Sequence, residues 1–221
     1  MLQLYEQATG RLACLLLDEG VLTELRTAAM GSLAVRLWGP KTVDCIGIVG
    51  TGVQARYQLR MLQHVTDCRT VVVWGRDPVK AQALCDELAP EGWTIHVVDS
   101  ITKILSECNV IVTTTSAREP VLAGGQPRDG SILVAIGSDA PGKQELSTDL
   151  SEGATRRIAD SEGQSRERGE YQRLSKGAQV WSLPEAFDHS GPLTTGYTIF
   201  DSSGVAVQDC VVAQMVYDAL A

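Results

Sequence analysis

Short apolar runs alternate with amphipathic stretches along most of this chain, beginning near residue 43. Val43–Gly50 (VDCIGIVG) is largely apolar, which is typical of a strand buried on both faces. After it, Ala55, Leu59 and Leu62 recur at the spacing of one helix stripe. A strand followed by a helix, repeated along the chain, predicts βαβ units and a parallel sheet.

The same alternation predicts the remaining elements of this sheet. Asp77 is a suitable N-cap for a helix with Pro78 at its first position, and Glu145 and Leu146 are expected to begin another helix. The other expected strands are Thr70–Trp74, Thr94–Val98, Val110–Thr114, Ile132–Gly137 and Ile158–Asp160. The other expected helices are Pro78–Ala89 and Ile101–Glu107. These continuous apolar strands predict a doubly wound, Rossmann-type α/β fold over residues 40–180.

The two ends of the chain follow a different pattern. Leu2–Leu16 predicts a hairpin that turns at Ala8–Gly10, and a helix is expected over Leu22–Trp38. Val205–Leu220 is an apolar helical stretch at the other end. We expect residues 1–38 and 200–221 to pack together as a smaller α+β unit, with 181–199 as a return segment.

Composition narrows the class of protein. The 221 residues are 44% hydrophobic and 21% charged, as in an ordinary globular chain, and the net charge is −8 without any Lys/Arg-rich run. Nucleic acid and anionic membrane surfaces are therefore not expected partners. No apolar run approaches the roughly 20 residues of a spanning helix, and the first residues do not have the pattern of a secretory signal. The six scattered cysteines lack metal-ligand spacing, so we expect reduced thiols, a cytoplasmic location and no metal site.

A glycine-rich motif lies between the first expected strand and helix of the sheet. Gly50, Gly52 and Ala55 form a GxGxxA sequence with Val53 and Gln54 between them. In this context the first glycine permits a tight turn, the second lets the backbone approach a pyrophosphate, and free helix N–H groups meet the anion. The motif predicts dinucleotide binding, and a plain glycine turn is the alternative.

The residues after the second strand of the sheet bear on the choice of cofactor. Gly75 and Arg76 follow Trp74, and no carboxylate stands directly after the strand. Because an arginine can hold a 2′-phosphate, NADP is favoured over NAD. Asp77 is the remaining carboxylate, and its plain interpretation is a helix cap.

Polar residues follow two further strands. Thr113 and Thr114 place hydroxyls at the carboxyl edge of the sheet, where they can hold a ribose or cap the next element. Gly137–Lys143 (GSDAPGK) follows a later strand, and Asp139 is expected to project into the same crevice or to stabilise the local turn. Gly137, Lys143 and Ser202 complete the candidate cofactor residues.

An arginine stands among small and apolar residues on the helix before the sheet domain. Arg26 is a candidate for an anionic ligand because a guanidinium keeps its charge in every environment. Pairing with Glu24 or Asp18 on the surface is the alternative. The three histidines have no neighbours that suggest a metal site or a catalytic relay.

Taken together and in this order, these motifs resemble the ornithine cyclodeaminase/mu-crystallin family, which also includes imine reductases and an alanine dehydrogenase. The resemblance covers essentially the whole chain. The motifs that carry it are LRTAA (25–29), GIVGTGVQA (47–55), VWGRDP (73–78), TTTS (113–116), GSDAPGKQEL (137–146) and GVAVQD (204–209).

The resemblance implies roles for two residues. Asp139 corresponds to the family's proposed proton donor and acceptor, and Arg26 to the arginine that binds the substrate carboxylate beside the nicotinamide. It also implies an amino or cyclic imino acid substrate and a homodimer. Family members carry a further N-terminal portion that supplies an Arg and a Lys for the substrate and much of the dimerisation sheet, and nothing here corresponds to it. We therefore expect an incomplete dimerisation and substrate unit, and little turnover by residues 1–221 alone.

Two kinds of function follow. The first is an oxidoreductase that transfers a hydride between nicotinamide and an amino or imino acid, as an imine reductase or during cyclodeamination. The second is a non-catalytic protein that binds NAD(P)H or a small ligand, like mu-crystallin, or an inactive fragment.

Overall fold

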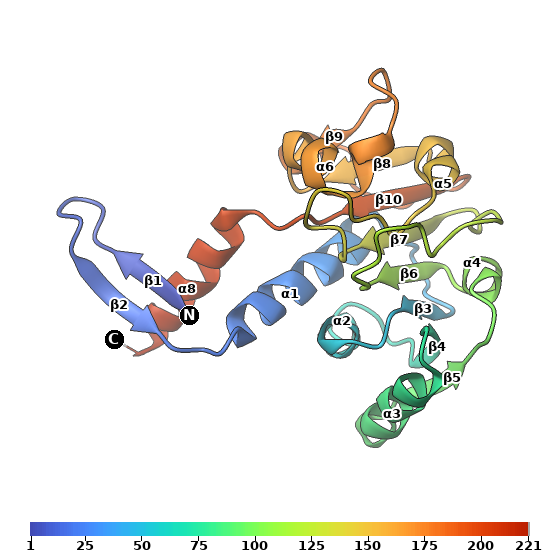
Figure 1. Cartoon of the computed structure of the whole chain (residues 1–221), viewed down its shortest axis with the longest axis horizontal. Helices are drawn as coiled ribbons and strands as arrows, with labels where there is room; N and C mark the ends of the chain where they lie inside the picture. The colour runs from blue at the N-terminus through green and yellow to red at the C-terminus, as the bar shows by residue number, and fades with distance from the viewer. Residues whose placement is uncertain (221) are drawn as a thin grey trace.

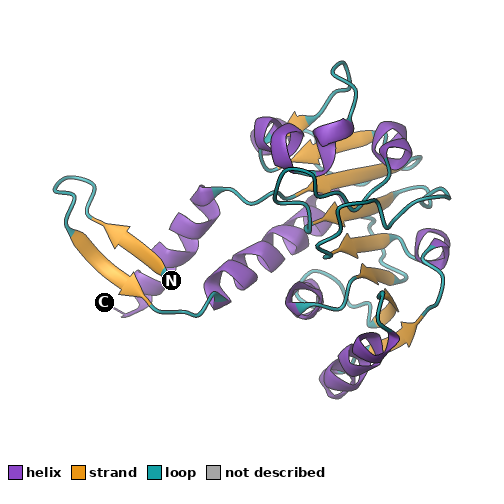
Figure 2. Cartoon of the chain, in the orientation of Figure 1, coloured by secondary structure: helices purple, strands orange, loops and turns teal. Residues whose placement is uncertain are grey.

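A single sheet of eight parallel strands forms the centre of the computed structural model, which describes residues 1–220 (Figures 1 and 2). The strands run in the order β5-β4-β3-β6-β7-β10-β8-β9. Their bounds are β3 (Ile46–Val49), β4 (Thr70–Trp74), β5 (Thr94–Val97), β6 (Val110–Thr113), β7 (Ser131–Ala135), β8 (Arg156–Ala159), β9 (Trp181–Ser182) and β10 (Tyr197–Asp201).

The direction of winding reverses between β3 and β6, which pair side by side with Ile46 opposite Val110. From β3 the chain moves outward through β4 to β5 and then returns to the other side of β3. In open sheets of this kind, ligands bind in the crevice beyond the carboxyl ends of the two strands at the reversal. The fold is therefore the doubly wound α/β class that the apolar strands predict.

Helices cover both faces of the sheet, and the central strands β3, β6, β7 and β10 are buried on both sides. Ile46 and Ile48 pack in one apolar cluster with Leu59 and Trp38, whereas Val49 packs in the other with Ile104. The first face is covered by α1 (Val21–Trp38), α2 (Val53–Leu62), α3 (Pro78–Leu88) and α7 (Leu183–Phe187). The second face is covered by α4 (Thr102–Glu107), α5 (Thr148–Gly153) and the 3-10 turn η2 (Glu170–Arg173), which follows α6 (Glu162–Arg168). A second 3-10 turn, η1 (Ala89–Glu91), follows α3.

Both ends of the chain lie together away from the sheet (Figure 1). The strands β1 (Leu2–Tyr5) and β2 (Leu12–Leu16) form an antiparallel hairpin, and α8 (Ala206–Leu220) contacts both β1 and α1. The long helix α1 connects this end unit to the sheet (Figure 2). Within residues 1–220, no helix combines the length and apolar character needed to cross a bilayer.

A strand and the start of a helix are among the features that differ from the sequence prediction. Tyr197–Asp201 is a central strand of the sheet between β7 and β8, so the sheet takes in parts of the expected return segment 181–199 and of the expected end unit 200–221. Phe200 of this strand is fully buried and stacks on Trp38 with ring centroids 5.8 Å apart. This contact ties the strand to the apolar core beneath α1. The second difference is at Glu145, where the helix was expected to begin: α5 starts only at Thr148, with Ser147 as its N-cap.

Candidate functional site

The glycine-rich loop between β3 and α2 lies at the carboxyl edge of the sheet. Gly50 has a φ of +117°, and a Cβ built there would lie 2.7 Å from Oγ1 of Thr114. Only glycine meets both demands, the backbone conformation and the close approach to the β6 end. The loop is thereby held against the neighbouring strand at the reversal point.

Gly52 leaves open space in front of the helix that follows it. A Cβ on Gly52 would meet no atom within 4 Å, and no side chain caps the amino end of α2. Ala55 is fully buried one turn later, and Val53 is exposed at the start of the helix. Uncapped N–H groups facing open space match what a pyrophosphate needs. The residues present therefore fit a dinucleotide.

The Gln54 side chain points to α1 rather than to the cavity beside the glycine-rich loop. Its Nε2 donates to the carbonyl oxygen of Glu24 at 3.2 Å and also to the Glu24 carboxylate, so the side chain links α2 to α1. Of the motif, Gly50, Thr51 and Gly52 line the neighbouring cavity.

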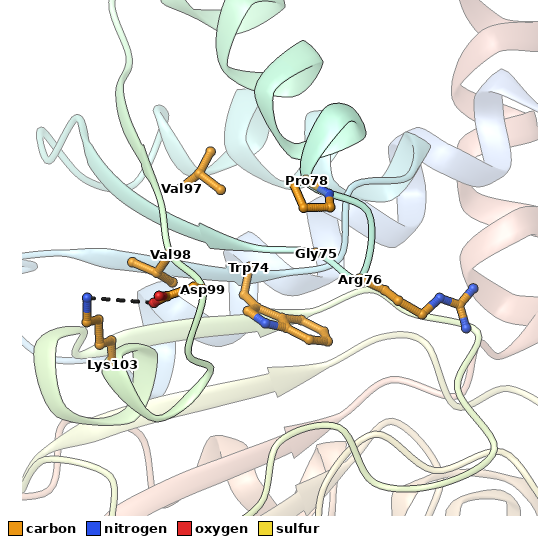
Figure 3. Close-up of a pocket in the computed structure, with 8 residues that line it drawn as sticks. All are labelled: Trp74, Gly75, Arg76, Pro78, Val97, Val98, Asp99 and Lys103. Carbon is orange, nitrogen blue, oxygen red and sulfur yellow. Dashed lines mark ion pairs between the residues drawn. The ribbon is translucent and has the colours of Figure 1, made fainter.

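Two adjoining hollows follow the carboxyl ends of the strands. The first, of about 400 Å³, lies over the glycine loop, and the second, of about 680 Å³, lies beside it toward β5. Trp74, Gly75 and Arg76 line both. In Figure 3 the Trp74 indole lies centrally, and Asp99 and Lys103 form an ion pair at 3.9 Å on one side of the second hollow. Together the two hollows, called the trough below, extend from the glycine-rich loop past the end of β4 to β5.

The residues after β4 carry net positive charge toward this trough. The Asp77 carboxylate accepts from the N–H groups of Val79 at 3.0 Å and Lys80 at 3.4 Å, so it caps α3 as the sequence predicts. Arg76 and Lys80 both line the first hollow, and neither has a salt bridge in the part of the chain that the structure describes. A Cβ at Gly75 would lie 2.5 Å from Cγ2 of Thr51, so any side chain there would require the Thr51 side chain to move.

The two predicted threonines have different environments. Thr114 lines the first hollow, and its hydroxyl donates to the Val49 carbonyl at 3.4 Å. Thr113 is fully buried, and its hydroxyl donates to Oε2 of Glu145 at 2.6 Å. The Thr113 hydroxyl is therefore turned into the protein, where it cannot hold a ribose as expected.

Glu145 was not a candidate in the sequence, yet it joins the strand ends beneath the site. Its fully buried carboxylate accepts from the Thr113 hydroxyl, the Thr115 N–H and the Gly137 N–H, the last at 2.8 Å. Burial raises the pKa of this carboxyl, and the three donors oppose the shift. Glu145 thus connects the loops after β6 and β7. The sequence signal that could have marked Glu145 is its place in the GSDAPGKQEL motif (137–146).

Two further buried carboxylates, Glu170 and Asp201, are linked to Glu145 through hydrogen bonds with backbone N–H groups. Glu170 accepts from the N–H of Glu145 at 2.7 Å and from that of Leu146 at 3.0 Å, and Asp201 accepts from the Glu170 N–H at 3.0 Å and from the Ser165 hydroxyl. Burial, reinforced by neighbouring carboxylates, raises the pKa of Glu170 well above its usual range and that of Asp201 to about 8. Sequence reasoning missed both residues, since nothing local marks them.

Asp139 is not buried in the crevice. Its side chain is 59% exposed and pairs with Lys143, whose Nζ donates to Oδ1 at 2.6 Å. Gly137 stands just before it, with its N–H on Glu145. Asp139, Lys143 and Gly137 all lie beyond the carboxyl end of β7, outside the lining of the two hollows.

Arg26 is bound by residues from the other end of the chain. Its Nε donates to Oδ1 of Asp209 at 3.1 Å, and its Nη1 to Oε1 of Gln208 at 3.0 Å. The surface partners that the sequence suggested, Glu24 and Asp18, do not make these contacts. Ser202 is also buried, and its hydroxyl donates to Asp160 at 3.3 Å rather than facing a cofactor.

The comparison with known proteins decides the family. The sequence profile of the ornithine cyclodeaminase/mu-crystallin family matches residues 1–221. The chain belongs to this family.

Among residues 1–220, no group of three or more His, Cys, Asp or Glu side chains has the arrangement of a metal site.

Members of the ornithine cyclodeaminase/mu-crystallin family resemble this chain in sequence and in structure. A cyclodeaminase of Sinorhizobium fredii is 34% identical over 98% of this chain and 69% of its own length. The crystal structure of the iminosuccinate reductase of Paracoccus denitrificans in complex with NAD+ matches with a TM-score of 0.89 and 31% identity, over 98% of this chain and 68% of that one. An archaeal alanine dehydrogenase dimer with bound NAD matches with a TM-score of 0.87 and 30% identity, over 97% and 68%.

Proposed function

We propose that this protein is an NAD(P)-dependent oxidoreductase that transfers a hydride between nicotinamide and the Cα of an amino or cyclic imino acid. The family members that it resembles include the iminosuccinate reductase, the alanine dehydrogenase and a ketimine reductase mu-crystallin of Mus musculus. The observation that carries the proposal is the uncapped start of α2 facing the open space at Gly52.

The cofactor would lie along the trough beyond the strand ends. Gly50, Gly52 and the first N–H groups of α2 would hold its pyrophosphate, with Thr114 beside them. Trp74 offers a flat apolar surface at the junction of the two hollows, suited to an adenine ring. The bound nicotinamide supplies or accepts the hydride.

The charges after β4 favour NADP over NAD. Gly75 presents no carboxylate to a ribose 2′-hydroxyl, Asp77 is engaged as a helix cap, and Arg76 and Lys80 line the hollow as cations. A 2′-phosphate would gain charge-assisted hydrogen bonds there.

For the substrate, we assign Arg26 to the carboxylate and Asp139 to the proton on the nitrogen. Reduction of an imine carbon requires a protonated nitrogen to withdraw electrons, and Asp139 is able to give that proton and later accept one. Lys143, paired with Asp139, holds this carboxylate in one orientation. Ordering the substrate through Arg26 reduces the entropic part of the barrier.

We also propose that the protein is a homodimer in the cytoplasm. Large apolar side chains are exposed on the hairpin and α8, and a second copy would cover them; they are Tyr5, Leu12, Leu15, Leu17, Val207, Val211 and Met215. All six cysteines are free thiols, as in a reducing compartment.

The test is turnover by the product of the complete coding region. NADPH or NADH is mixed with five- and six-membered cyclic imino acids, and the loss of reduced nicotinamide is followed by absorbance. We expect that product to bind the cofactor and to turn over at least one of these imino acids. Tight cofactor binding without turnover on any imine or amino acid would favour the non-catalytic ligand-binding function instead.

A further inference from the structure

Arg26 is anchored on one side only. Its side chain is 16% exposed, and the contacts with Asp209 and Gln208 use Nε and Nη1. Within residues 1–220, Nη2 has no hydrogen-bond partner. One part of the guanidinium is therefore fixed while the other remains available.

Gly204 makes room for this guanidinium. A Cβ at Gly204 would lie 3.2 Å from Nη1 and 3.5 Å from Nη2 of Arg26, and its φ is +82°. Gly204 stands in the short link between β10 and α8. The guanidinium therefore lies against the backbone at the carboxyl end of β10, the edge of the sheet that carries the rest of the site.

The link that carries Gly204 is itself held firmly. The Asp160 carboxylate accepts from the N–H of Gly204 at 2.8 Å and from the N–H and hydroxyl of Ser203 at 3.2 and 2.9 Å. From α6, Gln164 Nε2 donates to the Gly204 carbonyl at 2.6 Å. The first turn of α8, with Gln208 and Asp209, thus starts from a fixed point on the sheet.

We infer that Asp209, assisted by Gln208, is a positioning residue that holds the Arg26 guanidinium in the orientation in which Nη2 receives a substrate carboxylate. This role rests on the proposed function, in which Arg26 binds that carboxylate. A long arginine side chain otherwise samples many rotamers, and fixing it before the substrate arrives removes that cost from binding. The residue that orients the arginine therefore comes from the opposite end of the chain.

The first test measures the contact without any substrate. The Arg26 Nε–H resonance is identified by ¹⁵N–¹H NMR from its loss in Arg26→Ala. We expect Asp209→Ala to shift this signal upfield and speed its exchange with water. Asp218→Ala, a matched change on the exposed part of the same helix, should leave it in place. An unchanged Arg26 signal in Asp209→Ala overturns the inference.

The second test separates positioning from general support of the fold. With cofactor present, calorimetry compares L-proline with pyrrolidine, which lacks the carboxylate. Asp209→Ala should weaken L-proline binding about ten- to a hundredfold and leave pyrrolidine binding unchanged. Asp209→Asn, which keeps an acceptor oxygen, should restore part of the affinity. Equal losses for both ligands, or no loss for either, contradict the positioning role.

A double variant links the effect to Arg26. In the Arg26→Ala background, Asp209→Ala should cause no further loss of L-proline affinity, because the group that it positions is gone. Additive losses overturn the inference. Absence of turnover in the wild type, with the NMR and binding results as expected, would remove the proposed reaction while leaving the positioning of Arg26 intact.

Discussion

Nζ of Lys143 donates to Oδ1 of Asp139 at 2.6 Å, across four residues of the loop that follows β7. The candidate proton donor is thus an exposed carboxylate beside a cation. By contrast, Glu145, Glu170 and Asp201 are buried carboxylates that accept from backbone N–H groups of the loops and turns beyond the strand ends. The two kinds of acid should respond differently to substitution.

Asp139→Asn tests the exposed acid. The amide keeps the size of the side chain but cannot give or take the proton, so kcat should fall by about 10²–10⁴-fold while cofactor affinity is unchanged. The measurement is steady-state turnover with fluorescence titration of NADPH. Asp149→Asn, at an exposed position in the first turn of α5, serves as the control. Normal turnover by Asp139→Asn would exclude this residue as the proton donor.

The two glycines of the loop should separate stability from binding. Gly50→Ala should destabilise the fold by about 1–3 kcal/mol, because of its positive φ and the contact with Thr114. Gly52→Leu should leave stability nearly unchanged and abolish cofactor binding, since its side chain would occupy the open space. Urea unfolding and NADPH titration measure the two effects, with Gly177→Leu, also in open space, as the control. Unchanged cofactor affinity in a folded Gly52→Leu variant would contradict the placement of the pyrophosphate.

Arg76 should set the preference for NADPH. Arg76→Ala removes one charged hydrogen bond to the 2′-phosphate and should raise the Kd of NADPH about ten- to a hundredfold, with little effect on NADH. Lys80→Ala should have a smaller effect in the same direction. Lys41→Ala, an exposed cation before β3, provides the control. Tighter binding of NADH than NADPH by the wild type would refute the assignment.

Asp201 should make stability depend on pH. Its pKa of about 8 lies above the ordinary value of 3.8, so the buried group is neutral in the native state at low pH and ionises more readily in the unfolded chain. The stability that it contributes is present in acid and is lost as pH rises through about 8. Relative to Asp201→Asn, the wild type should lose up to about 1.4 kcal/mol per pH unit between about pH 5 and pH 8. Urea unfolding across this range measures the difference.

The same experiment carries its own control. The amide would put its nitrogen where Oδ1 of Asp201 now has no partner and keep the oxygen that accepts from Glu170. Glu145 and Glu170 remain in both proteins, so the part of their raised pKa values that comes from burial cancels in the comparison. Parallel pH profiles for the wild type and Asp201→Asn would show that Asp201 ionises equally readily in both states.

Local patterns predicted the parts of the site that depend on neighbours in the sequence. The turn at Gly50 and the cap at Asp77 follow from their own backbone geometry, and both lie where the motifs predict. The partner of Arg26 is Asp209, 183 residues away, and no periodicity reports such a contact. The role of Glu145 was not predicted for the same reason, because its hydrogen bonds form only where the ends of two strands meet in the sheet.

The contact between the hairpin and α8 bears on how the chain folds during synthesis. Leu2–Leu16 leaves the ribosome long before Ala206–Leu220, the helix against which it packs, and the sheet lacks a central strand until Tyr197–Asp201 is made. A two-stranded hairpin is at best marginally stable alone. The part of the hairpin that packs against α8 is therefore exposed until that helix is made, and such surfaces are where chaperones bind and aggregation begins. Slowing synthesis between residues 17 and 197, when the hairpin has been made and α8 has not, should thus favour aggregation.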